Sequence, residues 1–141
     1  MIKGITYILK TNAAFQSIVG QNRAMDKYKA YPVICPQPEI NPYSVVRITS
    51  KSLTHKGASG SNRNVFNVEF TVSSYHKNYD DVDLLDNAVI QALVPYRGSA
   101  NGVSFGWIEF GNSYDSYEDV YGGLYVRVSS FTCNVTLDSL T

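Results

Sequence analysis

Two stretches of the chain place apolar residues at helical spacing. Residues 80–94 have an apolar stripe, begin with aspartates that favour the positive end of a helix dipole, and stop at Pro95. Residues 2–19 show a similar stripe, and Gly20 is a typical residue just after a helix end. We therefore expect one helix over 2–19 and a second over about 80–94. The two stripes comprise Ile2, Ile5, Leu9, Phe15, Ile18 and Val19, and Val82, Leu85, Val89, Ala92 and Leu93.

Alternating apolar and polar residues predict the strands. The alternation is clearest from Phe66 to Ser73, and it is typical of a sheet with one buried face. Further strands are expected over 43–53, 102–111 and 124–137. In the last of these the apolar phase changes near Ser129 and Ser130, which predicts a bulge or bend.

Polar and proline-rich segments separate these elements. Four prolines between 32 and 42 favour an extended, polyproline-like connection after a short extended piece. Residues 54–62 are rich in glycine and serine, which predicts a mobile hairpin tip near 54–63. Residues 112–119 are polar and acidic, and we expect a loop there. Together these patterns predict a single α+β domain over 1–141. Its largely antiparallel sheet is built from two hairpins, with one or two helices packed on one face.

Charge is balanced overall but divided unevenly along the chain. The 141 residues carry twelve basic and twelve acidic side chains. Residues 1–63 hold nine basic and two acidic residues, a net charge of +7, and residues 64–141 hold three and ten, a net charge of −7. If the fold does not intermix them, two such faces would suit head-to-tail self-association. No apolar run reaches about 18 residues, so we expect no membrane-spanning helix.

No catalytic or metal-binding motif is evident. His55 and His76 lack partners at metal-ligand spacing, and Cys35 and Cys133 form no CxxC pair. The acidic runs match no calcium loop. We therefore expect no enzyme activity, metal or cofactor. Four of the eleven tyrosines, Tyr114, Tyr117, Tyr121 and Tyr125, recur near the second acidic run, where they favour a protein interface; plain sheet packing and single-stranded nucleic acid are the alternatives.

The order of features resembles the tail-completion, or tail-terminator, proteins of long-tailed (siphovirus-type) bacteriophages. The resemblance covers about residues 2–137. Its most specific parts are Pro36-Gln37, the strand opener Pro42-Tyr43-Ser44-Val45-Val46 and the helix from Asp83 to Leu93, followed by Tyr125-Val126-Arg127-Val128. The tyrosine-rich acidic segment 112–121 and the long C-terminal strand depart from the family pattern.

The resemblance implies an α+β structural virion protein without catalysis or cofactor. Such proteins assemble in the host cytoplasm as a ring, often a hexamer, that caps the head-proximal end of the tail tube and joins the neck. The implied partners are other copies of the chain, the tail tube protein and a neck or head-completion protein, and DNA passes through the lumen without sequence-specific contact. Candidate tip contacts with a partner or the lumen are Lys51, His55, Lys56 and Arg63, and candidate subunit contacts are Tyr114, Tyr117, Glu118, Asp119 and Tyr121.

Two other functions remain open at this point. One is a head-closure or neck adaptor protein of the same joint. The other is an α+β domain that binds a small molecule or single-stranded nucleic acid, which would need a pocket with convergent polar groups or an exposed aromatic sheet face.

Overall fold

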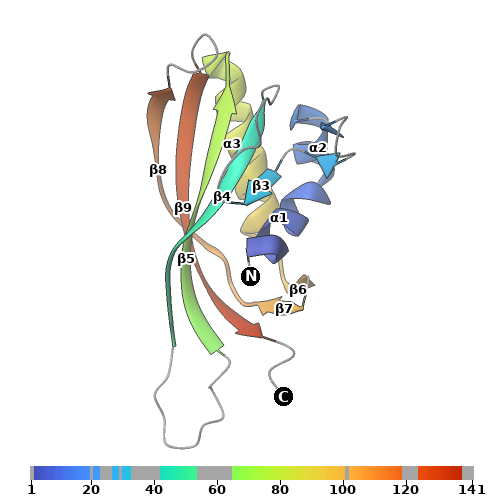
Figure 1. The fold of residues 1–141 in the computed structure, drawn as a ribbon, viewed down its shortest axis with the longest axis vertical. Coiled ribbons are helices and arrows are strands. Elements are labelled where there is room, and N and C mark those ends of the chain that lie inside the picture. Colours follow the sequence, from blue (N-terminus) through green and yellow to red (C-terminus); the bar gives the residue numbers. More distant parts are fainter. Residues whose placement is uncertain are drawn as a thin grey trace, which may run out of the picture.

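A computed structural model describes residues 2–19, 21–22, 27–28, 30–32, 42–53, 65–100, 102–118 and 124–137. Three helices lie on one side of a strongly twisted sheet (Figure 1). In chain order the elements are α1 (Ile2–Lys10), α2 (Ala13–Val19), β1 (Gln21–Asn22), β2 (Lys27–Tyr28), β3 (Ala30–Pro32), β4 (Tyr43–Leu53), β5 (Val65–His76), α3 (Tyr79–Leu93), β6 (Gly98–Ala100), β7 (Val103–Phe105), β8 (Glu109–Glu118) and β9 (Leu124–Leu137).

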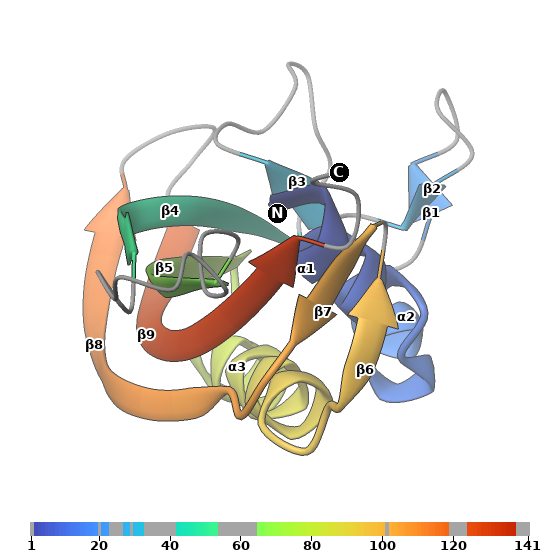
Figure 2. The same ribbon diagram turned by 90° about the horizontal axis from the view of Figure 1, so that it is seen from below.

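The main sheet has the strand order β3-β4-β5-β9-β7-β6, and β8 also pairs with β9. All of its pairings are antiparallel except β3 with β4. Seen from below, β8 and β9 are strongly curved (Figure 2). The predicted α+β class and the largely antiparallel sheet with helices on one face are confirmed.

The helix predicted over 2–19 is two helices, because the chain breaks at Thr11 and Asn12. The Thr11 hydroxyl bonds back to the Tyr7 carbonyl at 2.9 Å, and the Asn12 side chain accepts from the Phe15 N–H at 3.0 Å. Side chains of this kind compete with the helix backbone and favour caps. The second predicted helix is confirmed as α3, which begins after Asn78, whose side chain accepts from the Asp80 N–H.

The strand expected over 102–111 is instead two strands, β7 and the start of β8, and the loop expected over 112–119 is wrong for residues 112–118, which continue β8. Residue 119 lies outside the described residues. Val103–Phe105 forms β7 and pairs with the end of β9. The chain then leaves this ladder and pairs with β9 again, further along, as β8. The residue that turns inward is Ile108, whereas Trp107 is 73% exposed. Residues 112–118 are polar, and this composition predicted a loop. An edge strand that is exposed on its open side needs few apolar residues, so a polar segment can form one.

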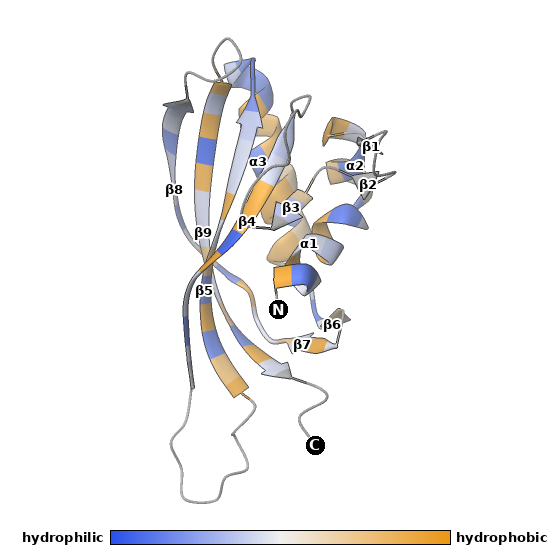
Figure 3. Cartoon of the chain, viewed as in Figure 1, coloured by the Kyte–Doolittle hydropathy of each residue, from blue (hydrophilic) through white to orange (hydrophobic). Residues whose placement is uncertain are grey.

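The phase change in β9 arises without a bulge in that strand. Its register against β5 is unbroken from Val65 opposite Thr136 to His76 opposite Tyr125. The bulge lies in the neighbouring β8, where Gly111 and Asn112 together oppose Ser130. Bands of opposite hydropathy alternate along β9 (Figure 3). The apolar set changes phase because the two halves of the sheet bury opposite faces.

The core is accordingly divided into two clusters. The larger one lies between the helices and the lower half of the sheet, where Phe70 and Phe131 stack with ring centroids 5.3 Å apart. The smaller one lies on the opposite face of the upper half and consists of Tyr31, Tyr43, Val45, Tyr75, Leu124 and Val126, with Val128 packed against it. The predicted alternation in 66–73 is confirmed, since Val68, Phe70 and Val72 are fully buried.

Candidate assembly surface

The helix-facing side of the upper sheet is polar and centres on Arg127 of β9. Its guanidinium bonds to Asp115 of β8 through Nε and to Asp83 of α3 through Nη1 at 2.9 Å. The Tyr79 hydroxyl of α3 donates to the second Asp115 oxygen at 2.9 Å. We call Arg127, Asp83, Asp86, Asp115 and Tyr79 the arginine clamp, because it joins α3, β8 and β9.

Asp86 is the buried member of the clamp. The residue is 1% exposed, and its carboxylate accepts from the Ser129 hydroxyl and lies 3.9 Å from Arg127 Nη1. Burial raises the pKa of Asp86, although the Ser129 hydrogen bond and Arg127 oppose the shift. By contrast, the hydrogen bonds from Arg127 and Tyr79 hold the pKa of the more exposed Asp115 below its usual value.

The two shifts give opposite pH dependences. Because the folded-state pKa of Asp86 is raised, its ionisation costs stability as the pH rises from the unfolded value through the folded one. The Asp86→Asn variant should therefore show a smaller fall in unfolding free energy across that window than the wild type. Urea unfolding at a series of pH values between about 4 and 7 measures this; parallel curves for the two proteins would contradict the assignment.

Two further acidic residues of the first predicted cluster lie at the start of α3. Asp80 and Asp81 occupy the first turn of α3, as expected. The second cluster does not form the expected solvated loop, since Asp115 is held by Arg127 within a strand. His76 accepts from the Asn78 N–H at 3.0 Å. In the described part of the chain no group of three or more His, Cys, Asp or Glu residues could hold a metal ion.

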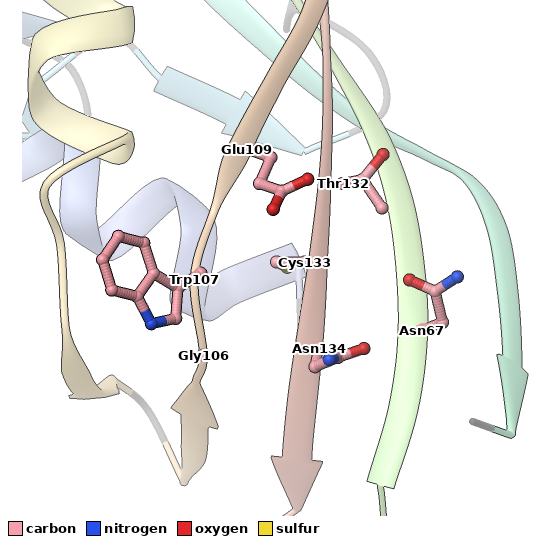
Figure 4. Close-up of a pocket in the computed structure, with 7 residues that line it drawn as sticks. All are labelled: Asn67, Gly106, Trp107, Glu109, Thr132, Cys133 and Asn134. Atoms are coloured by element: carbon pink, nitrogen blue, oxygen red, sulfur yellow. The ribbon is translucent and has the colours of Figure 1, made fainter. Parts of the chain in front are cut away.

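A hollow of about 410 Å³ opens where the chain detaches from β9. It is lined by Asn67, Gly106, Trp107, Glu109, Thr132, Cys133 and Asn134. Figure 4 shows the Trp107 indole directed away from the Asn67, Thr132 and Asn134 side chains. Burial raises the pKa of the Cys133 thiol to about 11, so it stays protonated at neutral pH. The polar groups that line the hollow are thus one carboxylate, amides and a hydroxyl. The lining offers the carboxylate no second acid or base and no activated nucleophile as a catalytic partner.

Exposed aromatic residues gather along β8 and the segment before it. Tyr117 of β8, Tyr125 of β9 and Tyr79 of α3 form a chain of edge-to-face contacts, with ring centroids 5.6 and 5.5 Å apart. The largest exposed apolar side chains of this region are Trp107, Phe110, Tyr114 and Tyr117, and Arg97 stacks on Trp107 at 3.7 Å. Aromatic residues and arginine exposed together are typical of protein-binding surfaces.

The structure places the described site residues on strands β4 and β8, which β5 and β9 separate. Lys51 is exposed on β4, with its ammonium 4.5 Å from the Phe66 ring centroid. Tyr114 and Tyr117 are exposed on β8, and Glu118 ends that strand. His55, Lys56, Arg63, Asp119 and Tyr121 lie outside the described residues, as does the whole predicted tip 54–63. Sequence reasoning missed the arginine clamp, whose members come from residues 79–127.

Comparison with known proteins shows a likeness of fold. No family model matches the chain, and no curated protein sequence matches it. A chain in the solved structure described as "Virion of native gene transfer agent (GTA) particle" has a similar fold, with a TM-score of 0.66 and 15% sequence identity. The match covers 94% of this chain and 92% of that one. No helix in the described residues is both long and apolar enough to cross a membrane.

Proposed function

We propose that this protein is a structural component of a phage-like virion and that, within it, the protein completes the tail. It forms a ring, with six copies expected, that caps the head-proximal end of the tail tube and joins it to the neck. The observation that carries the proposal is the shared fold with a chain of a gene transfer agent virion over nearly the full length of both chains. The role needs no catalysis or cofactor.

Two features of the described residues support an assembly role. First, β8 presents exposed tyrosines beside acidic residues, whereas β4, on the other side of β5 and β9, carries Arg47 and Lys51 and no acid. Second, the titratable groups of the clamp are engaged in joining α3 to the sheet, and the hollow lacks a paired acid and base. A subunit with two different complementary surfaces is what a cyclic ring requires.

Tail-tube capping tests the proposed role. The protein, mixed with the tail tube protein encoded in the same genome, should bind one end of each tube and stop its growth, as seen by negative-stain electron microscopy. Binding to a purified neck or portal complex but not to tubes would instead favour a head-closure or neck adaptor. Binding to neither would overturn the virion-joint assignment.

The tip near 54–63 is proposed to contact the tube or neck, or to line the lumen, with Lys51, His55, Lys56 and Arg63. Deleting 56–61 should leave the thermal unfolding midpoint nearly unchanged, because long surface hairpin tips add little to stability. The same deletion should abolish capping. The matched control replaces residues 56–61 by a segment of six glycine and serine residues, so that the length of the tip is unchanged. Normal capping by the deletion variant would remove the tip from the proposal.

A further inference from the structure

A row of three polar side chains crosses the face of the sheet that lies away from the helices. Thr132 of β9 pairs with Glu69 of β5 on one side and with Glu109 of β8 on the other. Directly opposite residues of antiparallel strands point to the same face, with Cα atoms about 4.5–5.5 Å apart. Phe70 and Phe131, which neighbour Glu69 and Thr132 in the sequence, are buried in the helix-facing core. Because side chains alternate along a strand, the row faces away from the helices.

This row borders the hollow between β5, β9 and the start of β8. Thr132 and Glu109 line the hollow, and the amides of Asn67 and Asn134 complete its polar wall. Figure 4 shows the Glu109 carboxylate extending toward β9. Within the described residues, the side chains of these four residues and of Glu69 form no hydrogen bond or ion pair. The hollow therefore presents acceptor oxygens that the chain itself leaves unused.

The three side chains of the row suit an ammonium ion. A lysine ammonium is a compact positive charge with three N–H donors and no acceptor. The carboxylates of Glu69 and Glu109 flank the Thr132 hydroxyl, so an ammonium above Thr132 can donate to all three groups. Two carboxylates on either side of one residue also repel each other, and a cation between them removes this repulsion.

Trp107 gives the rim of the hollow an apolar surface. Its side chain is the most exposed among the large apolar residues that the structure describes. Arg97 stacks on the indole with its guanidinium carbon 3.7 Å from the ring centroid, which holds the ring in place. The methylene stem of a lysine packs on such a ring while its ammonium reaches the carboxylates. Exposed tryptophan beside arginine is typical of the residues that dominate the energy of a protein interface.

The lysines of the chain lie mainly on the opposite side of the subunit. Six of the seven lysines belong to residues 1–63, whose net charge is +7. Both α1 and α2 come from this half, contain no acidic residue and lie on the other side of the sheet from the row (Figure 1). Lys3 of α1 is exposed, and within the described residues its ammonium forms no ion pair. The hollow and the helical side thus have complementary charge.

We propose that the hollow binds a lysine from the helical side of the next copy in the ring. The ammonium lies on Glu69, Glu109 and Thr132, and the stem lies on Trp107. This contact rests on the proposed ring-forming function and gives it a specific interface. It joins two different faces of the subunit, so it is a head-to-tail contact, which closes into a ring when the rotation between copies allows.

Carbodiimide cross-linking tests the contact. The reagent joins a carboxylate to a lysine amine in direct contact with it through an amide bond. The sample is an equal mixture of unlabelled and isotope-labelled protein, cross-linked after assembly, digested and analysed by mass spectrometry. We expect Glu69 or Glu109 joined to a lysine of residues 1–63, in forms where only one of the two peptides carries the label. Such mixed forms arise only between copies.

Asp80 is the internal control, because it is an exposed carboxylate on α3 and lies outside the row. Mixed cross-links of equal yield at Asp80 and Glu109 would show chance encounters and overturn the lysine contact. A ring without a mixed cross-link at Glu69 or Glu109 would overturn the contact as well and leave the proposed function intact. Absence of any oligomer, alone or on tail tubes, would overturn both.

Removing one carboxylate provides a second readout. Glu109→Gln should lower the association constant between subunits by about fivefold, which corresponds to about 1 kcal/mol for a partly exposed ion pair. The matched control Asp80→Asn removes one exposed carboxylate from α3 and should leave the association constant unchanged. Equal association constants for Glu109→Gln and the wild type would contradict the proposed role of Glu109.

Trp107 provides a third readout, because it is the one tryptophan of the sequence. Its fluorescence therefore reports on the rim of the hollow alone. As the protein concentration is raised through assembly, the emission should shift to shorter wavelength and acrylamide should quench it less, since the next copy excludes water from the indole. An oligomer that forms with unchanged emission and unchanged quenching would overturn the placement of this contact at the hollow.

Discussion

Replacing Arg127 by alanine is expected to lower the free energy of unfolding by about 3–5 kcal/mol. The reason is that Asp86 stays buried after the substitution and loses its nearest cation, while Asp83 and Asp115 lose their common partner. Removing the cation beside a buried carboxylate costs more than the pair contributes, because the remaining charge is left uncompensated. Equilibrium urea unfolding at neutral pH measures the loss.

Arg97 provides the matched control for this substitution. It is an exposed arginine that stacks on Trp107 and donates to the carbonyls of Val94 and Tyr96. Arg97→Ala should cost about 1 kcal/mol or less, because an exposed cation–π contact is weak. Adding Asp86→Asn to Arg127→Ala should recover part of the loss, since it removes the stranded charge. Equal effects of the two arginine substitutions would show that the clamp does not stabilise the fold.

Replacing Phe131 by alanine is expected to cost about 3–5 kcal/mol. Phe131 is fully buried, stacks on Phe70 and lies at the centre of the larger cluster beneath the helices. The loss combines the transfer of the ring to water with the cavity that remains. Thermal unfolding followed by circular dichroism measures the effect.

Phe110 is the natural control, because it contacts the same ring from the exposed side. Its centroid lies 5.7 Å from that of Phe131, and its side chain is 41% exposed. Phe110→Ala should cost about 1 kcal/mol, which is the worth of an aromatic pair without full burial. If Phe110→Ala were as destabilising as Phe131→Ala, the full burial of Phe131 would not be the cause of its large contribution.

The elements with strong periodicity could be predicted from the sequence. The alternation in Phe66–Ser73 and the aspartate-led stripe that ends at Pro95 identified β5 and α3, and both remain as expected. These segments bury one face along their length, so local pattern and tertiary environment agree. The fold class follows from them.

The errors concentrate where burial changes side within one element. β9 buries Leu124 and Val126 on one face and Phe131, Cys133 and Val135 on the other. In the sequence alone, this change of the buried face has the same pattern as a bulge. β8 has no buried apolar face of its own, because it is held by pairing with β9 and by the bond between Asp115 and Arg127. Its sequence therefore has the polar pattern of a loop. The clamp could not be predicted, because Asp83, Asp115 and Arg127 meet only after α3 folds onto the sheet.

The candidate assembly surface could be predicted only in part. Tyr114 and Tyr117 were identified from composition, and the structure places both on an exposed strand edge. The opposite charge of strands β4 and β8 also follows from the division of charge along the sequence. Which edges are open depends on strand order, and strand order is a property of the whole fold.

Native mass spectrometry across a concentration series tests most directly whether the chain forms a ring. We expect a discrete closed oligomer near six copies, about 94 kDa from a subunit of 15.7 kDa, with few intermediates, because a closed ring satisfies every heterologous surface. The same species should be present at the ends of tail tubes. A monomer at every concentration that also fails to bind tube ends would contradict the ring and the tail-completion role.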